Sequence, residues 1–236
     1  EFLEEIMEHN PLPVVMLCYF VIIGGDSFGI LPVFVLCALV GVAITMIPAS
    51  IYRRMRLGPV FDILNKKDTP DESFLRECKY KLLMSPRFEA KSLFVRYPIG
   101  VGATVAVLAL LGHMNGLRYL VTILATLMSI PINSAFFMFQ CELSLSPCLE
   151  DPRLAGVVLD QDSYTPFNIF PKIIFALLSI LLPPLTIFIT FIALIDAKML
   201  HLQHQAMHFT FIGVIMIGTC LMTAYFFAKS MTKTVR

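Results

Sequence analysis

Apolar segments long enough to cross a membrane recur along the chain, and short polar turns join them in pairs. A helix needs about 20 apolar residues to cross the ~30 Å hydrocarbon layer. Turn sequences of glycine and polar residues, Gly24–Ser27 and Gly112–Gly116, divide the first two pairs. We therefore predict an all-α polytopic membrane protein with six transmembrane helices arranged as three hairpins. The spans are expected at about residues 11–25, 30–52, 93–111, 117–139, 169–195 and 205–228.

The composition excludes a soluble fold. Of the 236 residues, 57% are apolar and the mean hydropathy is +0.79, whereas soluble domains are roughly 45–50% apolar. The six cysteines form no C-x-x-C pair, so they are expected to be core residues and neither a disulfide framework nor a zinc knuckle. The two long polar segments contain no P-loop, nucleophile elbow, zinc-protease helix or paired cyclase carboxylates. We expect no catalysis within these residues.

The basic residues are concentrated on one side of the predicted bundle. Sixteen of the eighteen Lys and Arg residues fall in segments that would share one face of the membrane. Only Arg118 and Lys198 fall in the opposite short turns. Because cytoplasmic loops carry an excess of Lys and Arg, both termini are predicted to be cytoplasmic.

Residues 53–91 join the second and third spans on the basic side. Their apolar positions have partly helical spacing, which predicts short helices against the membrane face, with a helix start at Thr69–Glu72. At the beginning of this segment, Arg53, Arg54 and Arg56 would meet anionic lipid.

Prolines recur at corresponding positions of the hairpins. Pro13, Pro98 and Pro171 lie at the expected entrances of odd-numbered spans, where a proline costs no backbone hydrogen bond. Pro59 and Pro147 close the exits of the second and fourth spans and are 88 residues apart. This spacing indicates a weak threefold repeat of the hairpin, with chance alignment of common prolines as the alternative.

Three histidines near the start of the last span lie on one face of the predicted helix. His201, His204 and His208 are spaced i, i+3 and i+7, which aligns them at 3.6 residues per turn. Imidazole binds Zn, Cu or Ni, and a metal site at the outer face would need further ligands from neighbouring turns. The candidates for these are His113, Asp26 and Asp196. Plain interfacial placement and proton sensing remain open as other uses of the histidines.

A polar stripe follows the fourth predicted span. Thr122, Thr126, Ser129 and Asn133 recur at i, i+4, i+7 and i+11. Hydroxyl and amide groups in hydrocarbon need partners, so this face is predicted to turn into the bundle. It would serve either helix packing or the lining of a small ligand cavity. No ionisable residue lies at the middle of a predicted span, which argues against an ion-coupled transporter.

The segments that flank the spans resemble those of a known family. They are Arg53–Pro59, Arg96–Pro98, Leu145–Pro147 and the terminal Tyr225–Lys233. With these segments the chain resembles the six-helix membrane domain that precedes a HAMP linker and a catalytic domain in bacterial class III adenylyl cyclases. The resemblance implies a transmembrane sensor domain at 1–228 and the start of a HAMP or signalling linker at 229–236. It also implies a parallel homodimer in the bacterial inner membrane.

The expected function is that of a membrane sensor for an extracytoplasmic or membrane-borne ligand, such as a lipid or a small molecule. The signal would pass through the last span to an effector, which in this family is an adenylate cyclase that makes cAMP from ATP. The output residues are expected to be Lys229, Ser230, Met231, Thr232 and Lys233. The lipid bilayer is the expected partner, and nucleic acid is not. A small membrane transporter or permease and a membrane haem or copper oxidoreductase are the alternatives.

Overall fold

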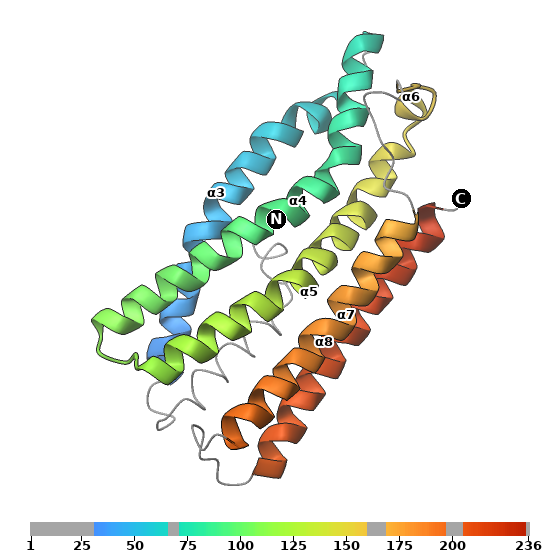
Figure 1. Cartoon of the computed structure of the whole chain (residues 1–236). Coiled ribbons are helices and arrows are strands. Elements are labelled where there is room, and N and C mark those ends of the chain that lie inside the picture. The colour runs from blue at the N-terminus through green and yellow to red at the C-terminus, as the bar shows by residue number, and fades with distance from the viewer. Residues whose placement is uncertain (1–30, 66–70, 160–168, 197–204, 235–236) are drawn as a thin grey trace.

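The computed structural model describes residues 31–65, 71–159, 169–196 and 205–234, and these residues are helical apart from short turns (Figure 1). No strand occurs among them. The helices are α3 (Leu31–Asn65), α4 (Glu72–Leu110), α5 (Gly116–Leu149), the short α6 (Pro152–Ala155), α7 (Ile169–Asp196) and α8 (Gln205–Thr234). All but α6 are long and apolar enough to cross a membrane.

Five of the six predicted spans therefore coincide with apolar helices, and the protein is a multi-pass membrane protein. The remaining predicted span, at about 11–25, lies outside the described residues. The four long helices other than α5 bury little of their most apolar stretches. Their exposed side chains therefore present an apolar surface to the surrounding lipid. Examples on α7 are Leu181, Leu185 and Ile189, each more than half exposed.

Helix α5 is the centre of the bundle. It runs between the α3/α4 pair and the α7/α8 pair (Figure 1) and contacts α4, α7 and α8. Of its most apolar stretch, 65% is buried, whereas the other four long helices bury between 12% and 28% of theirs. A core cluster lies near the beginnings of α3, α5 and α8 and the ends of α4 and α7. Its most buried members are Phe34, Leu108, Phe191 and Ile212. Among the five long helices, α5 thus has the smallest share of its apolar stretch available to lipid.

The two ends of the bundle differ in charge, and we name them accordingly. The basic end is where α3, α5 and α8 end and α4 and α7 begin. The turn end is the opposite one, where the turn 111–115 joins α4 to α5. In Figure 1 the C-terminus lies at the basic end.

At the basic end, α3 and α4 continue far beyond the predicted spans. They contain 35 and 39 residues, or about 52 and 58 Å at 1.5 Å per residue, which is well beyond the ~30 Å hydrocarbon layer. Residues 53–65 and 72–92 are therefore continuous with the membrane helices, and the prediction of separate short helices was wrong. The predicted start of α4 is confirmed, because Asp71 is its N-cap residue.

The prolines taken as span ends lie within helices. Pro59 is inside α3, Pro98 inside α4 and Pro147 inside α5. A proline in a helix removes one backbone hydrogen bond, and neighbouring helices can compensate for that loss. The interpretation of Pro59, Pro98 and Pro147 as helix boundaries is thus corrected.

The extensions have an apolar core of their own. Its buried members, from four helices, are Leu57, Val60, Cys78, Leu82, Leu145 and Leu154. This core explains why apolar residues occur at helical spacing in a segment that looks polar on average. The helices extend because their protruding parts can bury this surface against one another, since packing of an apolar face is what stabilises most helices in proteins.

Two cations hold the helix ends of this extension together. Arg153 donates to the backbone oxygens of Ile63 and Leu64, at 3.2 and 2.7 Å, in the last turn of α3. Lys79 of α4 donates to the backbone oxygens of Leu154 and Val157, at 2.9 and 2.8 Å, at the end of α6. Cations are favoured at helix C-termini because the carbonyls there lack intrahelical partners.

Candidate functional site

A polar group that joins three helices near the membrane boundary is the carboxylate of Glu142, in the last third of α5. One of its oxygens accepts a hydrogen bond from the ammonium of Lys172, at the start of α7. The other accepts a hydrogen bond from the hydroxyl of Ser230, near the end of α8, at 2.6 Å. One carboxylate therefore joins the three helices α5, α7 and α8, and we call this group the Glu142 junction.

The two partners of Glu142 are shielded from water, whereas the Glu142 side chain itself is 26% exposed. Lys172 is 5% exposed and Ser230 is 1% exposed. A buried ammonium is tolerated only when it is paired and hydrogen-bonded, and loss of its partner leaves an uncompensated charge. The position of α8 relative to α5 and α7 is thus fixed at the basic end by interactions that cannot be lost individually without a large cost.

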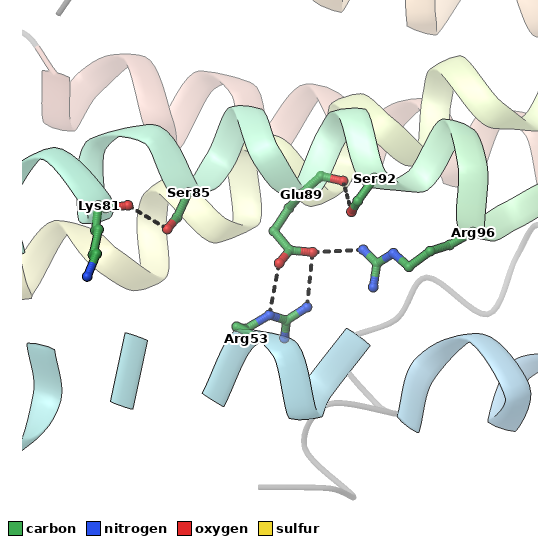
Figure 2. A network of polar contacts seen from close by, with 6 residues as sticks. All are labelled: Arg53, Lys81, Ser85, Glu89, Ser92 and Arg96. Carbon is green, nitrogen blue, oxygen red and sulfur yellow. Dashed lines mark hydrogen bonds and ion pairs between the residues drawn. The ribbon is translucent and has the colours of Figure 1, made fainter. Parts of the chain in front are cut away.

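A second polar network lies between α3 and α4, at the same end of the bundle (Figure 2). The Glu89 carboxylate accepts two hydrogen bonds from Arg53, at 3.1 and 3.2 Å, and one from Arg96, at 2.7 Å. Figure 2 shows Glu89 of α4 between the two guanidinium groups, with Arg53 reaching it from α3. The side chain of Glu89 is 9% exposed. Both of its oxygens are therefore fully used by arginine.

The two networks have opposite arrangements of charge. Between α3 and α4 the base Arg53 is on the outgoing helix and the acid Glu89 is on the incoming one. Between α5 and α7 the acid Glu142 is on the outgoing helix and the base Lys172 is on the incoming one. Each pair joins two antiparallel helices where their apolar segments end.

The predicted metal ligands lie at the turn end where the structure describes them. His113 is in the turn between α4 and α5, Asp196 ends α7 and His208 is in the first turn of α8. Three further predicted ligands, His201, His204 and Asp26, are outside the described residues. Within the described part of the chain, no three His, Cys, Asp or Glu side chains gather as a metal site would require.

The turn at His113 is held by hydrogen bonds and by a glycine. Gly112 has a φ of +76°, a left-handed conformation that glycine adopts without strain. Asn115 caps α5 by accepting from the backbone N–H of Arg118 at 2.9 Å. The guanidinium of Arg118 donates to the backbone oxygen of His113, and this arginine is only 6% exposed. Arg118, one of the two cations expected in the outer turns, therefore has a structural contact that closes the turn.

All four residues of the predicted polar stripe on α5 are buried, as expected: Thr122, Thr126, Ser129 and Asn133. Thr126 donates to the backbone oxygen of Thr122 at 2.6 Å, and Asn133 donates to that of Ser129 at 2.9 Å. These bonds engage the Thr126 hydroxyl and the Asn133 amide group within α5 itself. The Thr122 hydroxyl is buried and has no hydrogen-bond partner among the described residues.

The stripe and the Glu142 junction lie on opposite faces of α5. Asn133 and Glu142 are separated by nine residues, which at about 100° per residue corresponds to half a turn around the helix axis. A ligand that touched the stripe would therefore act on the side of α5 opposite to its contacts with Lys172 and Ser230. Any effect on α8 would require movement of α5 as a whole.

The predicted output residues continue α8 without a break as far as Thr234. Ser230 faces inward to Glu142, whereas Lys229 and Thr232 are exposed. The Lys229 ammonium lies 5.7 Å from the ring centroid of Tyr225, one turn earlier. The Thr232 hydroxyl donates to the backbone oxygen of Lys229. Met231 is half-buried, and the side chain of Lys233 is outside what the structure describes.

The carboxylates that organise the site were not predicted from the sequence. Glu89 lies in the segment 53–91, which was predicted to form short helices against the membrane, and Glu142 was assigned no role. One signal was present in the sequence: acidic and basic residues flank the ends of consecutive apolar segments with opposite signs. The pairing itself depends on helix register, which only the structure provides.

The fold and the polar networks define a multi-pass helical membrane protein whose helices are tied together at one end by buried ion pairs. No known protein family matches the chain, and no curated protein or solved structure does so either.

Proposed function

We propose that the chain is a membrane sensor domain that transmits a signal through α8 to an effector, and that this effector is an adenylyl cyclase making cAMP. The observation that carries the proposal is the Glu142 junction. Ser230, in the predicted output segment, is buried and bonds Glu142 of α5. The other oxygen of Glu142 bonds Lys172 of α7, so the segment is tied to both helices.

The shape of α8 supports this role. It is one helix of 30 residues from the turn end to the predicted output segment. Displacement of its first turn, which contains His208, is therefore transmitted along a rigid element to Ser230. A signalling domain needs an element with two arrangements that a ligand can bias. The hydrogen bond between Ser230 and Glu142 is a discrete contact that a shift of α8 relative to α5 would break.

The resemblance to the six-helix membrane domains of class III cyclases supplies the identity of the effector, the membrane and the parallel homodimer. The stimulus is proposed to be an extracytoplasmic or membrane-borne ligand, and a transition metal held at the turn end is one candidate. The HAMP or signalling linker is proposed to begin at residue 229.

The test is cAMP production by the full-length natural protein in membranes of cells that lack other adenylyl cyclases. Glu142→Gln keeps the shape of the side chain but removes its charge, so it should release α8 and change basal cAMP production severalfold. Glu150→Gln, which makes the same change at an exposed carboxylate at the end of α5 outside the junction, is the matched control and should leave cAMP production unchanged. Absence of cAMP from the wild-type protein would exclude the cyclase effector. Equal cAMP production by Glu142→Gln and wild type would exclude the junction as the coupling element.

A further inference from the structure

Three small residues lie where α5, α7 and α8 meet, farther toward the turn end than the Glu142 junction. Ala135, Ser179 and Thr223 are each seven residues from the member of the junction on their own helix. Seven residues make nearly two full turns, so each of the three shares the face that its helix turns to the junction, about 10 Å away along the axis. We call these three residues the small layer.

Contacts on both sides of the small layer bring the three helices together at this level. Toward the basic end, a core cluster that includes Ala135 joins α5 and α7, and residues of α8 pack against it. Toward the turn end, the Cys220 thiol of α8 lies 3.4 Å from the backbone oxygen of Ile180 of α7. Cys220 is three residues before Thr223, and Ile180 follows Ser179 directly. Ser179 and Thr223 therefore lie between two contacts that hold their helices side by side.

The hydroxyl of Ser179 is buried in the small layer and has no hydrogen-bond partner among the described residues. The residue is 1% exposed. A buried hydroxyl without a hydrogen bond costs free energy, because it has given up its bonds to water. On the neighbouring helix, Thr223 is 0% exposed and donates to the backbone oxygen of Thr219 at 2.9 Å. The oxygen of the Thr223 hydroxyl can still accept a hydrogen bond.

The size and chemistry of the small layer suit a water molecule. Ala135, the member from α5, is 0% exposed, and its methyl group is the smallest side chain that a residue other than glycine can carry. None of the three side chains bears a charge, so the layer does not suit an ion. A buried water typically makes two to four hydrogen bonds to polar groups that otherwise lack partners.

We propose that the small layer binds a water molecule that bridges Ser179 of α7 and Thr223 of α8 inside the membrane. The Ser179 hydroxyl donates to the water oxygen, and the water donates to the oxygen of the Thr223 hydroxyl. A bridging water is nearly as favourable as a direct hydrogen bond. The water therefore gives α7 and α8 a second polar connection, two helical turns from the Glu142 junction. This inference does not depend on the signalling role of α8.

The test detects the water by NMR of the full chain in lipid bilayers, with isotope-labelled methyl groups of alanine and threonine. Wild type should show cross peaks between water and the methyl groups of Ala135 and Thr223. Ser179→Ala should reduce both cross peaks severalfold, because it removes one of the two partners of the water. The matched control is Ser85→Ala, which removes a buried hydroxyl that bonds the backbone oxygen of Lys81 in its own helix. It should leave both cross peaks unchanged.

Thermal unfolding in detergent is the second measurement. Loss of the bridge should lower the melting temperature of Ser179→Ala by about 2–4 °C relative to Ser85→Ala. Absence of both water cross peaks from wild type would overturn the proposal, and so would cross peaks of equal intensity in wild type and Ser179→Ala. A melting temperature of Ser179→Ala at or above that of wild type would also overturn it, because the hydroxyl would then be unpaired.

Discussion

Gly41 of α3 and Gly100 of α4 bring the backbones of the two helices into direct contact. A Cβ atom at Gly41 would lie 2.3 Å from the backbone oxygen of Gly100 and 2.3 Å from the hydroxyl of Thr104. The Thr104 hydroxyl lies 3.2 Å from the backbone oxygen of Cys37, across the same contact. Each helix presents a small residue and, four positions later, a threonine, Thr45 or Thr104. Small residues at this spacing allow close helix packing in membranes.

Gly41→Ala is therefore expected to destabilise the protein by about 1–3 kcal/mol, as overpacking does, because the backbone it meets cannot move aside. The control is Gly102→Ala on α4, whose Cβ would meet nothing within 4 Å. This second substitution should be neutral or stabilising by about 0.5–1 kcal/mol, since alanine loses less backbone entropy than glycine. Thermal unfolding in detergent checks both, and equal destabilisation by the two substitutions would contradict the close approach.

The Glu89 network predicts that two acidic residues of α4 contribute very differently to the free energy of unfolding. Glu89→Gln leaves Arg53 and Arg96 without a compensating charge and should cost about 3–5 kcal/mol of stability. Glu72→Gln breaks an exposed pair with Arg76 and should cost less than about 1 kcal/mol. Chemical denaturation in lipid nanodiscs measures the two values. A Glu89→Gln variant as stable as Glu72→Gln would show that the triad contributes nothing.

Thr122, in the polar stripe on α5, and Thr104 of α4 should respond differently to the same substitution by valine. Thr122→Val removes a buried hydroxyl that has no partner in the described chain, so stability should be unchanged or higher. Thr104→Val removes the contact with Cys37 and should cost about 1 kcal/mol. Melting temperatures separate the two. If Thr122→Val is instead clearly destabilising, the hydroxyl has a partner, as it would in a ligand or water cavity.

Asp151 predicts the acid dependence of the extension at the basic end. Its hydrogen bonds with the Arg153 side chain and backbone hold the pKa of the Asp151 carboxyl below its usual value of 3.8. A carboxyl whose pKa is lowered by folding adds stability above its unfolded pKa, and this stability is lost as the pH falls through the folded pKa. Asp151→Asn should therefore lower stability at pH 7 and reduce the loss between about pH 5 and 2.

The control for Asp151→Asn is Glu150→Gln, one residue earlier, whose carboxylate bonds the Ser146 hydroxyl at 3.2 Å. It should leave the acid dependence close to that of wild type. The measurement is the pH dependence of unfolding monitored in the same detergent. An Asp151→Asn variant with the acid dependence of wild type would contradict the assigned pKa direction.

Hydropathy alone could predict the five described membrane helices, because the bilayer demands long apolar segments whatever their neighbours are. The burial of Thr122 and Asn133 was also predictable, since polar groups avoid hydrocarbon. The helix ends predicted from the prolines were wrong. Pro59 and Pro147 are compatible with a helix where other helices pack against it, and sequence does not reveal that packing.

The ion pairs could not be predicted for a different reason. Glu89 and Arg53 are 36 residues apart, and Glu142 and Lys172 are 30 residues apart. Their pairing follows from the register of whole helices, which is set by contacts such as that between Gly41 and Gly100. The cap that Arg153 provides to α3 likewise depends on how the chain returns after α5.

The most direct test of the account is the side of the membrane on which each end of the bundle lies. Single cysteines at Gly116, at the turn end, and at Glu77, at the basic end, are both at exposed positions. They are introduced into a variant without the six native cysteines and treated with a membrane-impermeant maleimide in intact cells. The account predicts labelling of Gly116→Cys in intact cells and of Glu77→Cys only after permeabilisation. Labelling of both from outside, or of Glu77→Cys alone, would contradict it.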